Sequence, residues 1–293
     1  MTADRQAFVV GLDGMVGSRL AAAFEHRGIR VWGSTRNHPT TGGKRIYLDL
    51  ADHVDHFVPP FSGAGTAILC AACTSIDQCQ REPRATRLVN VDNTIALAEK
   101  FVDAGMFVIL LSSNTVFDGF TAFPRPQDLP NPSHEYGRQK ADAEKRLLGM
   151  GKNTAVVRFS KIIAPDMPLL SGWMRELRSG RSVHPFSDAV MAPISAAFAT
   201  ELICRVATSQ HPGVIQASAT DDISYAGAAR YLAAKIAADM DLVKPISSKD
   251  AGRSGFPDHA TLDTAELAEL GLEAPPPTRA LDQFLDLPSG DRT

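Results

Sequence analysis

Over the first half of the chain, short apolar segments with the pattern of strands alternate with longer amphipathic segments with the pattern of helices. Short apolar, β-branched runs predict strands at 7–12, 29–35, 66–72, 106–113 and 154–163. Amphipathic stretches predict helices at 17–28, 86–105 and 136–151. The run at 106–113 is apolar at almost every position, which is typical of a strand covered on both faces. The alternation predicts an α/β fold with a doubly wound parallel sheet.

The rhythm of the pattern changes after residue 164. We expect a further strand at 212–219, a helix at 224–240, and short terminal helices at 264–271 and 279–285. This pattern predicts that the C-terminal third forms a smaller lid on the edge of the sheet. We divide the chain into a domain at 1–164, a second region at 165–287 with elements that return to the sheet, and a frayed tail at 288–293.

The composition of this 293-residue chain argues against disorder and against binding to nucleic acid or membranes. With 44% hydrophobic residues, 22% charged residues and a net charge of −3, it has neither the bias of a disordered chain nor a broad basic surface for nucleic acid. No apolar run approaches the roughly 18 residues of a membrane helix, and the first apolar piece is too short for a secretory signal. We expect a cytoplasmic protein without nucleic-acid or membrane partners.

The cysteines do not predict a metal site. Their spacing lacks paired metal ligands, so we expect no bound metal and small core side chains in a reducing compartment. They are Cys70, Cys73, Cys79 and Cys204.

A glycine-rich loop, GLDGMVG, separates the first strand from the first helix. Gly11, Gly14 and Gly17 would let the backbone approach a pyrophosphate, and the N-terminus of the helix that follows supplies N–H donors. Met15 and Val16, between the last two glycines, are also predicted to bind the cofactor. The spacing G-x-x-G-x-x-G also suits a plain tight turn. Its position between a strand and a helix favours nucleotide binding.

The end of the second strand indicates which nucleotide binds. NAD sites place an acidic residue there, whereas this chain has Ser34, Thr35 and Arg36. A hydroxyl and a guanidinium can bind a 2′-phosphate, so we predict NADP(H) over NAD(H). Alternatively, Arg36 is a solvated loop residue. Asp49, followed by Leu50, is predicted to reach the adenine edge.

Several motifs along the chain carry a family resemblance. They are SSNTVFDG at 112–119, NPSHEYGRQKADAE at 131–144, AACTSIDQCQREPRATRLVN at 71–90, FSDAVMAPIS at 186–195 and FPDHATLDTAELAELGL at 256–272. Together they resemble the extended short-chain dehydrogenase/reductase superfamily, and within it the dTDP-4-dehydrorhamnose reductase family. The resemblance implies a Rossmann-type, NADP(H)-binding domain, with Ala71, Ala72 and Cys73 at the cofactor, and a smaller C-terminal substrate-binding lid.

Tyr136 and Lys140 form the catalytic pair that the resemblance implies. They are four residues apart and so share a helix face. We expect Lys140 to lower the pKa of Tyr136 and to hold the nicotinamide ribose, while Tyr136 donates a proton to the carbonyl oxygen as hydride arrives. Ser113 would hydrogen-bond the same oxygen. Isolated pairs of this kind are frequent on surface helices, but the glycine loop and the strand-end serine favour catalysis.

The chain departs from the family pattern on the substrate side. Ser113 replaces a threonine, Asn114 an aspartate and Thr115 a tyrosine, and Lys161 stands where the family has a substrate-facing tryptophan. Lys161 either binds an anionic group or simply ends a strand, and Arg178, with Arg175 and Arg181, either holds a diphosphate or is solvated. The predicted substrate-binding residues are Asn114, Lys161, Arg178 and Asp188.

The resemblance implies an NADP(H)-dependent reductase of the 4-keto group of a nucleotide-linked deoxysugar. Two alternatives stay open. A nucleotide-sugar epimerase or dehydratase uses the same Ser-Tyr-Lys set, although no Glu stands beside Asn114 as a dehydratase acid or base. A non-catalytic NADP-binding relative would instead regulate a partner protein. A homodimer through the 86–105 and 136–151 helices would suit the superfamily.

Overall fold

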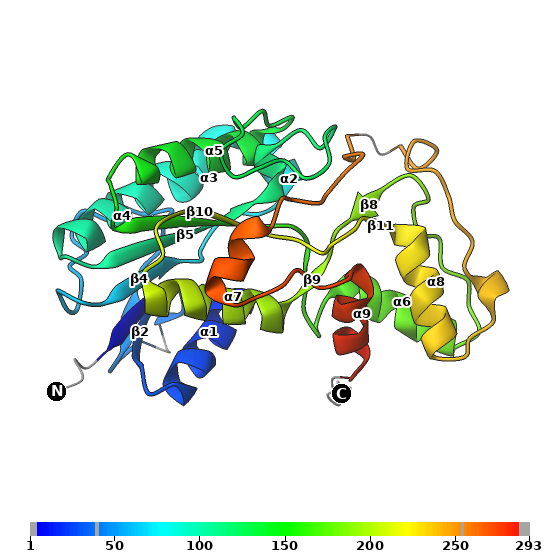
Figure 1. Cartoon of the computed structure of the whole chain (residues 1–293), viewed down its shortest axis with the longest axis horizontal. Helices are drawn as coiled ribbons and strands as arrows, with labels where there is room; N and C mark the ends of the chain where they lie inside the picture. The colour runs from blue at the N-terminus through cyan, green and yellow to red at the C-terminus, as the bar shows by residue number, and fades with distance from the viewer. Residues whose placement is uncertain (1–4, 39–40, 253–254, 287–293) are drawn as a thin grey trace.

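The computed structural model describes residues 5–38, 41–252 and 255–286, and its larger lobe is built on a parallel sheet of seven strands (Figure 1). The strand order is β10-β6-β5-β4-β1-β2-β3, which confirms the doubly wound α/β prediction. The strands are β1 (Gln6–Val10), β2 (Arg30–Thr35), β3 (Arg45–Tyr47), β4 (Thr66–Leu69), β5 (Phe107–Ser113), β6 (Thr154–Phe159) and β10 (Gly213–Ala217). The order reverses between β1 and β4, and ligands bind at the carboxyl ends of strands beside such a switch point.

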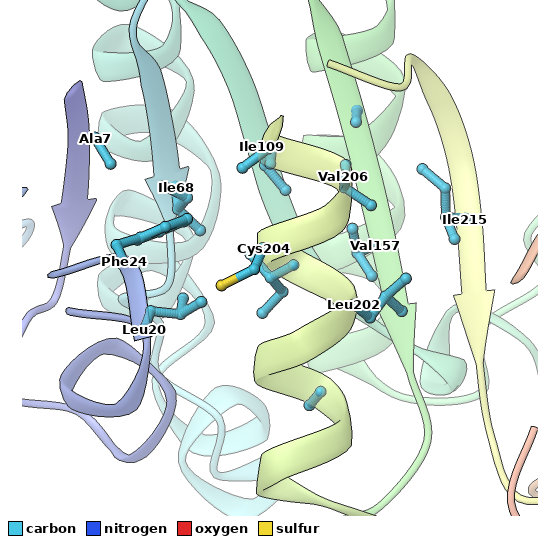
Figure 2. Close-up of a cluster of buried hydrophobic side chains, with 14 of the residues drawn as sticks. Ala7, Leu20, Phe24, Ile68, Ile109, Val157, Leu202, Cys204, Val206 and Ile215 are labelled. Atoms are coloured by element: carbon cyan, nitrogen blue, oxygen red, sulfur yellow. The ribbon is translucent and has the colours of Figure 1, made fainter. Parts of the chain in front are cut away.

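Helices cover both faces of the sheet. One face carries α1 (Met15–His26) and α7 (Ala196–Ser209), and the other carries α4 (Asn93–Asp103) and α5 (Glu135–Leu148) (Figure 1). In Figure 2, Phe24 of α1 and Leu202 of α7 lie in the core that also contains Ile68 and Val157 of the sheet. Each such buried side chain contributes about 1.5–3 kcal/mol, so this core fixes α1 and the loop before it.

The expected helix at 86–105 is divided into three pieces. It consists of α3 (Pro83–Arg87), a π-helical turn η2 (Leu88–Asp92) and α4, preceded by α2 (Ile76–Arg81). The π turn carries Asn90, which is 1% exposed and whose amide nitrogen donates to Cys73 O at 2.9 Å and to Gln139 Oε1 at 2.8 Å. Such turns are inserted where a helix must present a particular side chain, here a buried amide that needs polar partners.

The smaller lobe contains α6 (Pro168–Arg178), α8 (Tyr225–Lys235) and α9 (Pro277–Asp286) (Figure 1). Its core joins Leu170 and Trp173 of α6 to Leu232 of α8. Its remaining elements are short. They are β7 (Ile162–Ile163), β8 (Val190–Met191), β9 (Ile194–Ser195), β11 (Ile223–Ser224) and the 3₁₀ turn η4 (Met240–Leu242). Two further 3₁₀ turns belong to the larger lobe: η3 (Asn114–Val116) follows β5, and η5 (Ala265–Leu270) places Leu267 and Leu270 in the core with α1 and α7.

The chain returns from the second region to the sheet. Both α7 and β10 lie beyond residue 164 and belong to the larger lobe, as the predicted division allowed. The predicted tail at 288–293 lies outside the described residues. Within the described part of the chain, no helix has the length and apolarity needed to cross a membrane.

Candidate active site

The glycine loop has the backbone geometry that its sequence requires. Gly11 has a φ of +88°, and its carbonyl accepts a hydrogen bond from Gly14 N at 3.1 Å. A Cβ on Gly17 would lie 2.1 Å from Gly11 O, which no side chain can occupy. No side chain caps the start of α1, and Met15 at its first position is 39% exposed. The first N–H groups of the helix are therefore available to an anion.

Ser34 and Thr35 have partners inside the protein, which their sequence did not predict. Ser34 Oγ accepts from Gly11 N at 2.9 Å, and Thr35 Oγ1 donates to the carboxylate of Asp13. Asp13 also accepts from Arg45 Nη1 at 2.8 Å. Both hydroxyls thus fasten the glycine loop to β2, while Arg36 is exposed. Asp13 escaped the sequence analysis, although its place inside the glycine loop was a signal that an acid would stand beside the cofactor.

The loops after β1 and β4 meet at the switch point. Ala71 N donates to Val10 O at 3.0 Å, and a Cβ on Gly11 would contact Ala71 Cβ at 3.0 Å. Cys73 N donates to Asn90 Oδ1 at 2.7 Å, which fixes the residues after β4, including Ala72. These contacts enclose the crevice in which we predict the dinucleotide.

The adenine-side residues follow β3. Leu50 is buried in the core, and Asp49 accepts from Ala51 N at 2.9 Å, which closes its own turn. Contact of either residue with adenine stays a prediction.

The structure brings Tyr136 and Lys140 to the end of β5. Lys140 Nζ donates to Leu111 O at 2.8 Å, two residues before Ser113. The start of α5 packs against the turn after β5, because a Cβ on Gly137 would lie 2.1 Å from Thr115 O. Tyr136 and Lys140 are 8% and 4% exposed. Both side chains are therefore enclosed by protein beside the end of β5, unlike a pair on a solvated helix.

Burial controls the protonation of this pair. It raises the pKa of Tyr136, and the Cys79 and Cys73 thiols add to the effect. The predicted lowering of the tyrosine pKa by Lys140 is therefore wrong in direction for the protein itself. Burial lowers the pKa of Lys140 to about 8, against the opposing charge of Glu144. At neutral pH Tyr136 is a neutral phenol, the protonation state that a proton donor requires.

Ser113 is held by its neighbours. Its Oγ accepts from Thr115 N at 3.2 Å and from Thr115 Oγ1 at 3.1 Å, and donates to Asn114 Oδ1 at 3.3 Å. Asn114 Nδ2 in turn donates to Ala260 O at 3.2 Å. Asn114, predicted to bind substrate, thus uses both ends of its amide within the protein.

The other predicted substrate residues are dispersed. Lys161 follows β6 at the same sheet edge as Ser113, and burial by the surrounding loops lowers its pKa although the side chain still reaches solvent. Arg178 is exposed at the end of α6. Asp188 accepts from Ser247 Oγ at 2.7 Å and from Ser248 N at 2.8 Å, and these bonds lower its pKa. Of Lys161, Arg178 and Asp188, Lys161 is the one that follows a strand end beside Ser113.

The arrangement matches known proteins over nearly its whole length. The model of the family described as "RmlD substrate binding domain" matches residues 5–288. A probable low-salt glycan biosynthesis reductase of Haloferax volcanii is 25% identical over 281 residues, covering 92% of this chain and 93% of that protein. A structure of dTDP-4-dehydrorhamnose reductase from Bacillus anthracis in complex with NADP superposes with a TM-score of 0.83 at 18% identity, covering 97% and 99% of the two chains.

Methionine adenosyltransferase 2 subunit beta is a second kind of relative, and the length of the match differs between species. The protein of Rattus norvegicus is 23% identical over 293 residues, which is 94% of this chain and 85% of that protein. Methionine adenosyltransferase 2 subunit beta of Pongo abelii is 27% identical over 193 residues, which is 66% of this chain and 55% of that protein. The match thus spans about half the length of this relative. Because the family model covers all but the ends of the sequence, the chain belongs to the RmlD substrate binding domain family, and with it to the extended short-chain dehydrogenases/reductases, a superfamily of NAD(P)-dependent oxidoreductases.

Proposed function

We propose that this protein is an NADP(H)-dependent reductase of the 4-keto group of a nucleotide-linked deoxysugar. The observation that carries the proposal is the hydrogen bond from Lys140 Nζ to Leu111 O, which holds the Tyr136 helix against the strand that ends at Ser113. Hydride from the nicotinamide would reach the carbonyl carbon while Tyr136 gives its proton to the oxygen. Ser113 would hydrogen-bond that oxygen and Lys140 the nicotinamide ribose. The raised pKa of Tyr136 supports reduction, because the phenol keeps its proton until the substrate oxygen takes it.

The preference for NADP(H) rests on the exposed Arg36 at the end of β2. Ser34 and Thr35 no longer support it, since both bond within the protein. Arg45 partly neutralises the Asp13 carboxylate, which would otherwise repel a 2′-phosphate. Both cofactor types occur among the structural neighbours, one of which contains NADP and another NAD.

The sugar and the residues that bind it are also part of the proposal. Lys161 would face the nucleotide sugar, because it follows β6 beside the end of β5. A structural neighbour is a UDP-glucose 4-epimerase with UDP-glucose, at a TM-score of 0.72. The homodimer and the cytoplasmic location stay predictions.

A second candidate, a nucleotide-binding subunit without its own catalysis, is favoured by the similarity to methionine adenosyltransferase 2 subunit beta. It predicts cofactor binding without turnover of any keto sugar. The presence of Ser113, Tyr136 and Lys140 supports the reductase over this alternative.

Thermal unfolding with NADPH, NADP, NADH and NAD tests the cofactor part of the proposal. A ligand at a hundred times its Kd adds about 2.7 kcal/mol of stability, and we expect NADPH to give the largest shift. Gly17→Ala should abolish the shift, because its Cβ would meet Gly11 O. Gly172→Ala is the control, since no atom lies within 4 Å of its added Cβ.

NADPH oxidation with a panel of nucleotide-linked 4-keto-6-deoxysugars tests the reaction. Turnover with one of them supports the reductase. NADPH binding without turnover of any of them favours the subunit, and no stabilisation by any nucleotide overturns both candidates.

A further inference from the structure

A segment of the smaller lobe, residues 256–263, crosses the carboxyl ends of the sheet. His259 N donates to Gly119 O at 2.8 Å in the loop after β5, and Leu262 N donates to Ser218 Oγ at 3.0 Å just after β10. Packing at Gly119 is tight, because a Cβ there would lie 2.2 Å from Pro257 Cβ. The segment is therefore fixed to two strand ends that β6 separates in the sheet.

Asp222 holds the middle of this segment. Its Oδ1 accepts from Ala260 N at 2.8 Å, and its Oδ2 lies 3.0 Å from His259 Nδ1. Asp222 lies in the loop between β10 and β11, and its side chain is 18% exposed, against 42% for that of His259. One carboxylate thus sets both the Ala260 peptide and the His259 ring.

The backbone of Ala260 connects Asp222 to the end of β5, through its N–H on one side and its carbonyl on the other. Ala260 O accepts from Asn114 Nδ2 at 3.2 Å, while Asn114 Oδ1 accepts from Ser113 Oγ at 3.3 Å. Only the nitrogen of an amide can donate, so the Ala260 carbonyl determines that the amide oxygen faces Ser113. The aspartate of the family pattern has no donor for this carbonyl. The connection therefore depends on the Asn114 of this chain.

We propose that Asp222, supported by His259, is a positioning residue for Ser113. It acts through the two backbone peptide groups that flank Ala260 and through the Asn114 amide, and it makes the alignment of the Ser113 hydroxyl depend on the docking of segment 256–263. The inference rests on the proposed function, in which Ser113 hydrogen-bonds the substrate carbonyl oxygen: the single hydroxyl proton that Ser113 donates to Asn114 Oδ1 would turn to that oxygen when the substrate binds. A hydroxyl that loses this support visits other rotamers, and small misplacements in an active site lower the rate by up to about a hundredfold.

Kinetics of variants at 222 provide the first test. Asp222→Ala should lower kcat with the keto sugar about ten- to a hundredfold, with the KM for NADPH unchanged. Asp222→Asn should keep most of kcat, because its amide oxygen still accepts from Ala260 N. The matched control is Asp221→Ala, since the neighbouring Asp221 is exposed and accepts from Thr220 Oγ1 at 2.9 Å. Wild-type kcat in Asp222→Ala would overturn the proposal.

A double-mutant cycle distinguishes positioning from a general structural effect. Asn114→Ala should lose as much kcat as Asp222→Ala, and the double variant should lose no more than either single one. Asn114→Asp should behave like Asn114→Ala, because a carboxylate cannot donate to Ala260 O. Full additivity of the two losses contradicts the proposed path through Asn114.

An NMR measurement keeps this inference separate from the proposed function. The side-chain amide signals of Asn114, identified by their absence in Asn114→Ala, should move in Asp222→Ala and stay in place in Asp221→Ala. If the wild-type protein reduces no keto sugar, the proposed function fails while these signals still report on the connection. Unmoved signals in Asp222→Ala overturn the inference, whatever the activity.

Discussion

The two lobes use their charged residues differently. In the sheet lobe, Arg158 of β6 and Glu144 of α5 form an ion pair at 2.7 Å with side chains 3% and 1% exposed, and Arg158 also donates to Gln216 Oε1 at 3.0 Å. In the smaller lobe, Arg175 and Arg181 pair with Glu176 while 73% and 58% exposed. Buried pairs fix geometry because neither partner can leave, whereas exposed pairs contribute little. The helix that carries Tyr136 is therefore held to the sheet by a buried ion pair, and the smaller lobe depends on packing and on the segment at 256–263.

Substitution of Tyr136 should show the largest effect. Tyr136→Phe removes the proton donor but keeps the ring in place, and we expect kcat for keto-sugar reduction to fall about 10³-fold. Stabilisation by NADPH should persist, because the cofactor contacts lie elsewhere. Tyr231→Phe is the control in the smaller lobe, where the hydroxyl bonds Asp282 at 2.7 Å. A variant of Tyr136 that retained a tenth of kcat would remove this residue from its proposed role.

The buried ion pair gives the next largest effect and tests the contrast between the lobes. Arg158→Met leaves Glu144 buried without its partner, so the free energy of unfolding should fall by about 3 kcal/mol or more in urea titrations. Arg178→Met, which changes an exposed arginine of the smaller lobe, should stay within about 0.5 kcal/mol of wild type.

The double variant Arg158→Met/Glu144→Leu sharpens this result. Replacing both charges removes the unpaired carboxylate, so part of the lost stability should return. If the double variant were as unstable as the sum of its two single variants, the loss would come from packing and not from the uncompensated charge.

The strands and the helix that carries Tyr136 and Lys140 could be predicted because their signals are local. Apolar runs mark β1, β5 and β6, and the four-residue spacing of Tyr136 and Lys140 already places them on one helix face. The break at 88–92 was missed, because it depends on partners of Asn90 that come from Cys73 and Gln139, far along the chain.

The substrate side could not be predicted for a related reason. Its contacts join residues far apart in the sequence, 146 positions for Asn114 and Ala260 and 59 for Asp188 and Ser247, and no local pattern contains such a pairing. The predicted direction of the Tyr136 pKa shift was wrong for a similar reason. The helix spacing predicts that the charge of Lys140 lowers this pKa, but burial of the phenol, which raises it, depends on the whole fold. The hydroxyls of Ser34 and Thr35 were predicted to bind a 2′-phosphate, but each makes a hydrogen bond to the glycine loop, which the sequence alone did not indicate.

The smallest predicted effect concerns the pH dependence of stability. Burial lowers the pKa of Lys140 from 10.5 to about 8, so between these pH values the unfolded chain holds a proton that the folded protein has released. The contribution of Lys140 to stability therefore rises with pH across this window, because the folded state no longer buries an ammonium ion. Lys140→Met never carries this charge. The free energy of unfolding of Lys140→Met should exceed that of wild type most near pH 7, and this excess should shrink by up to roughly 3 kcal/mol towards pH 10.

Comparison with a lysine of the same helix isolates this effect. Burial raises the pKa of Cys70 to about 12, against the opposing charge of Lys140, and burial also raises the pKa of Tyr136, so both groups lower stability at high pH. The loss at Cys70 is larger in Lys140→Met, which lacks the opposing charge, and it shrinks the advantage of this variant in the same direction. Lys145 is exposed on α5, and Lys145→Met should differ from wild type by an amount that does not change between pH 7 and 10. Urea titrations at pH 7, 8, 9 and 10 measure both differences. A flat difference for Lys140→Met would mean that the Lys140 ammonium is solvated in the folded protein, and the crevice at the end of β5 would then be open to water before any ligand arrives.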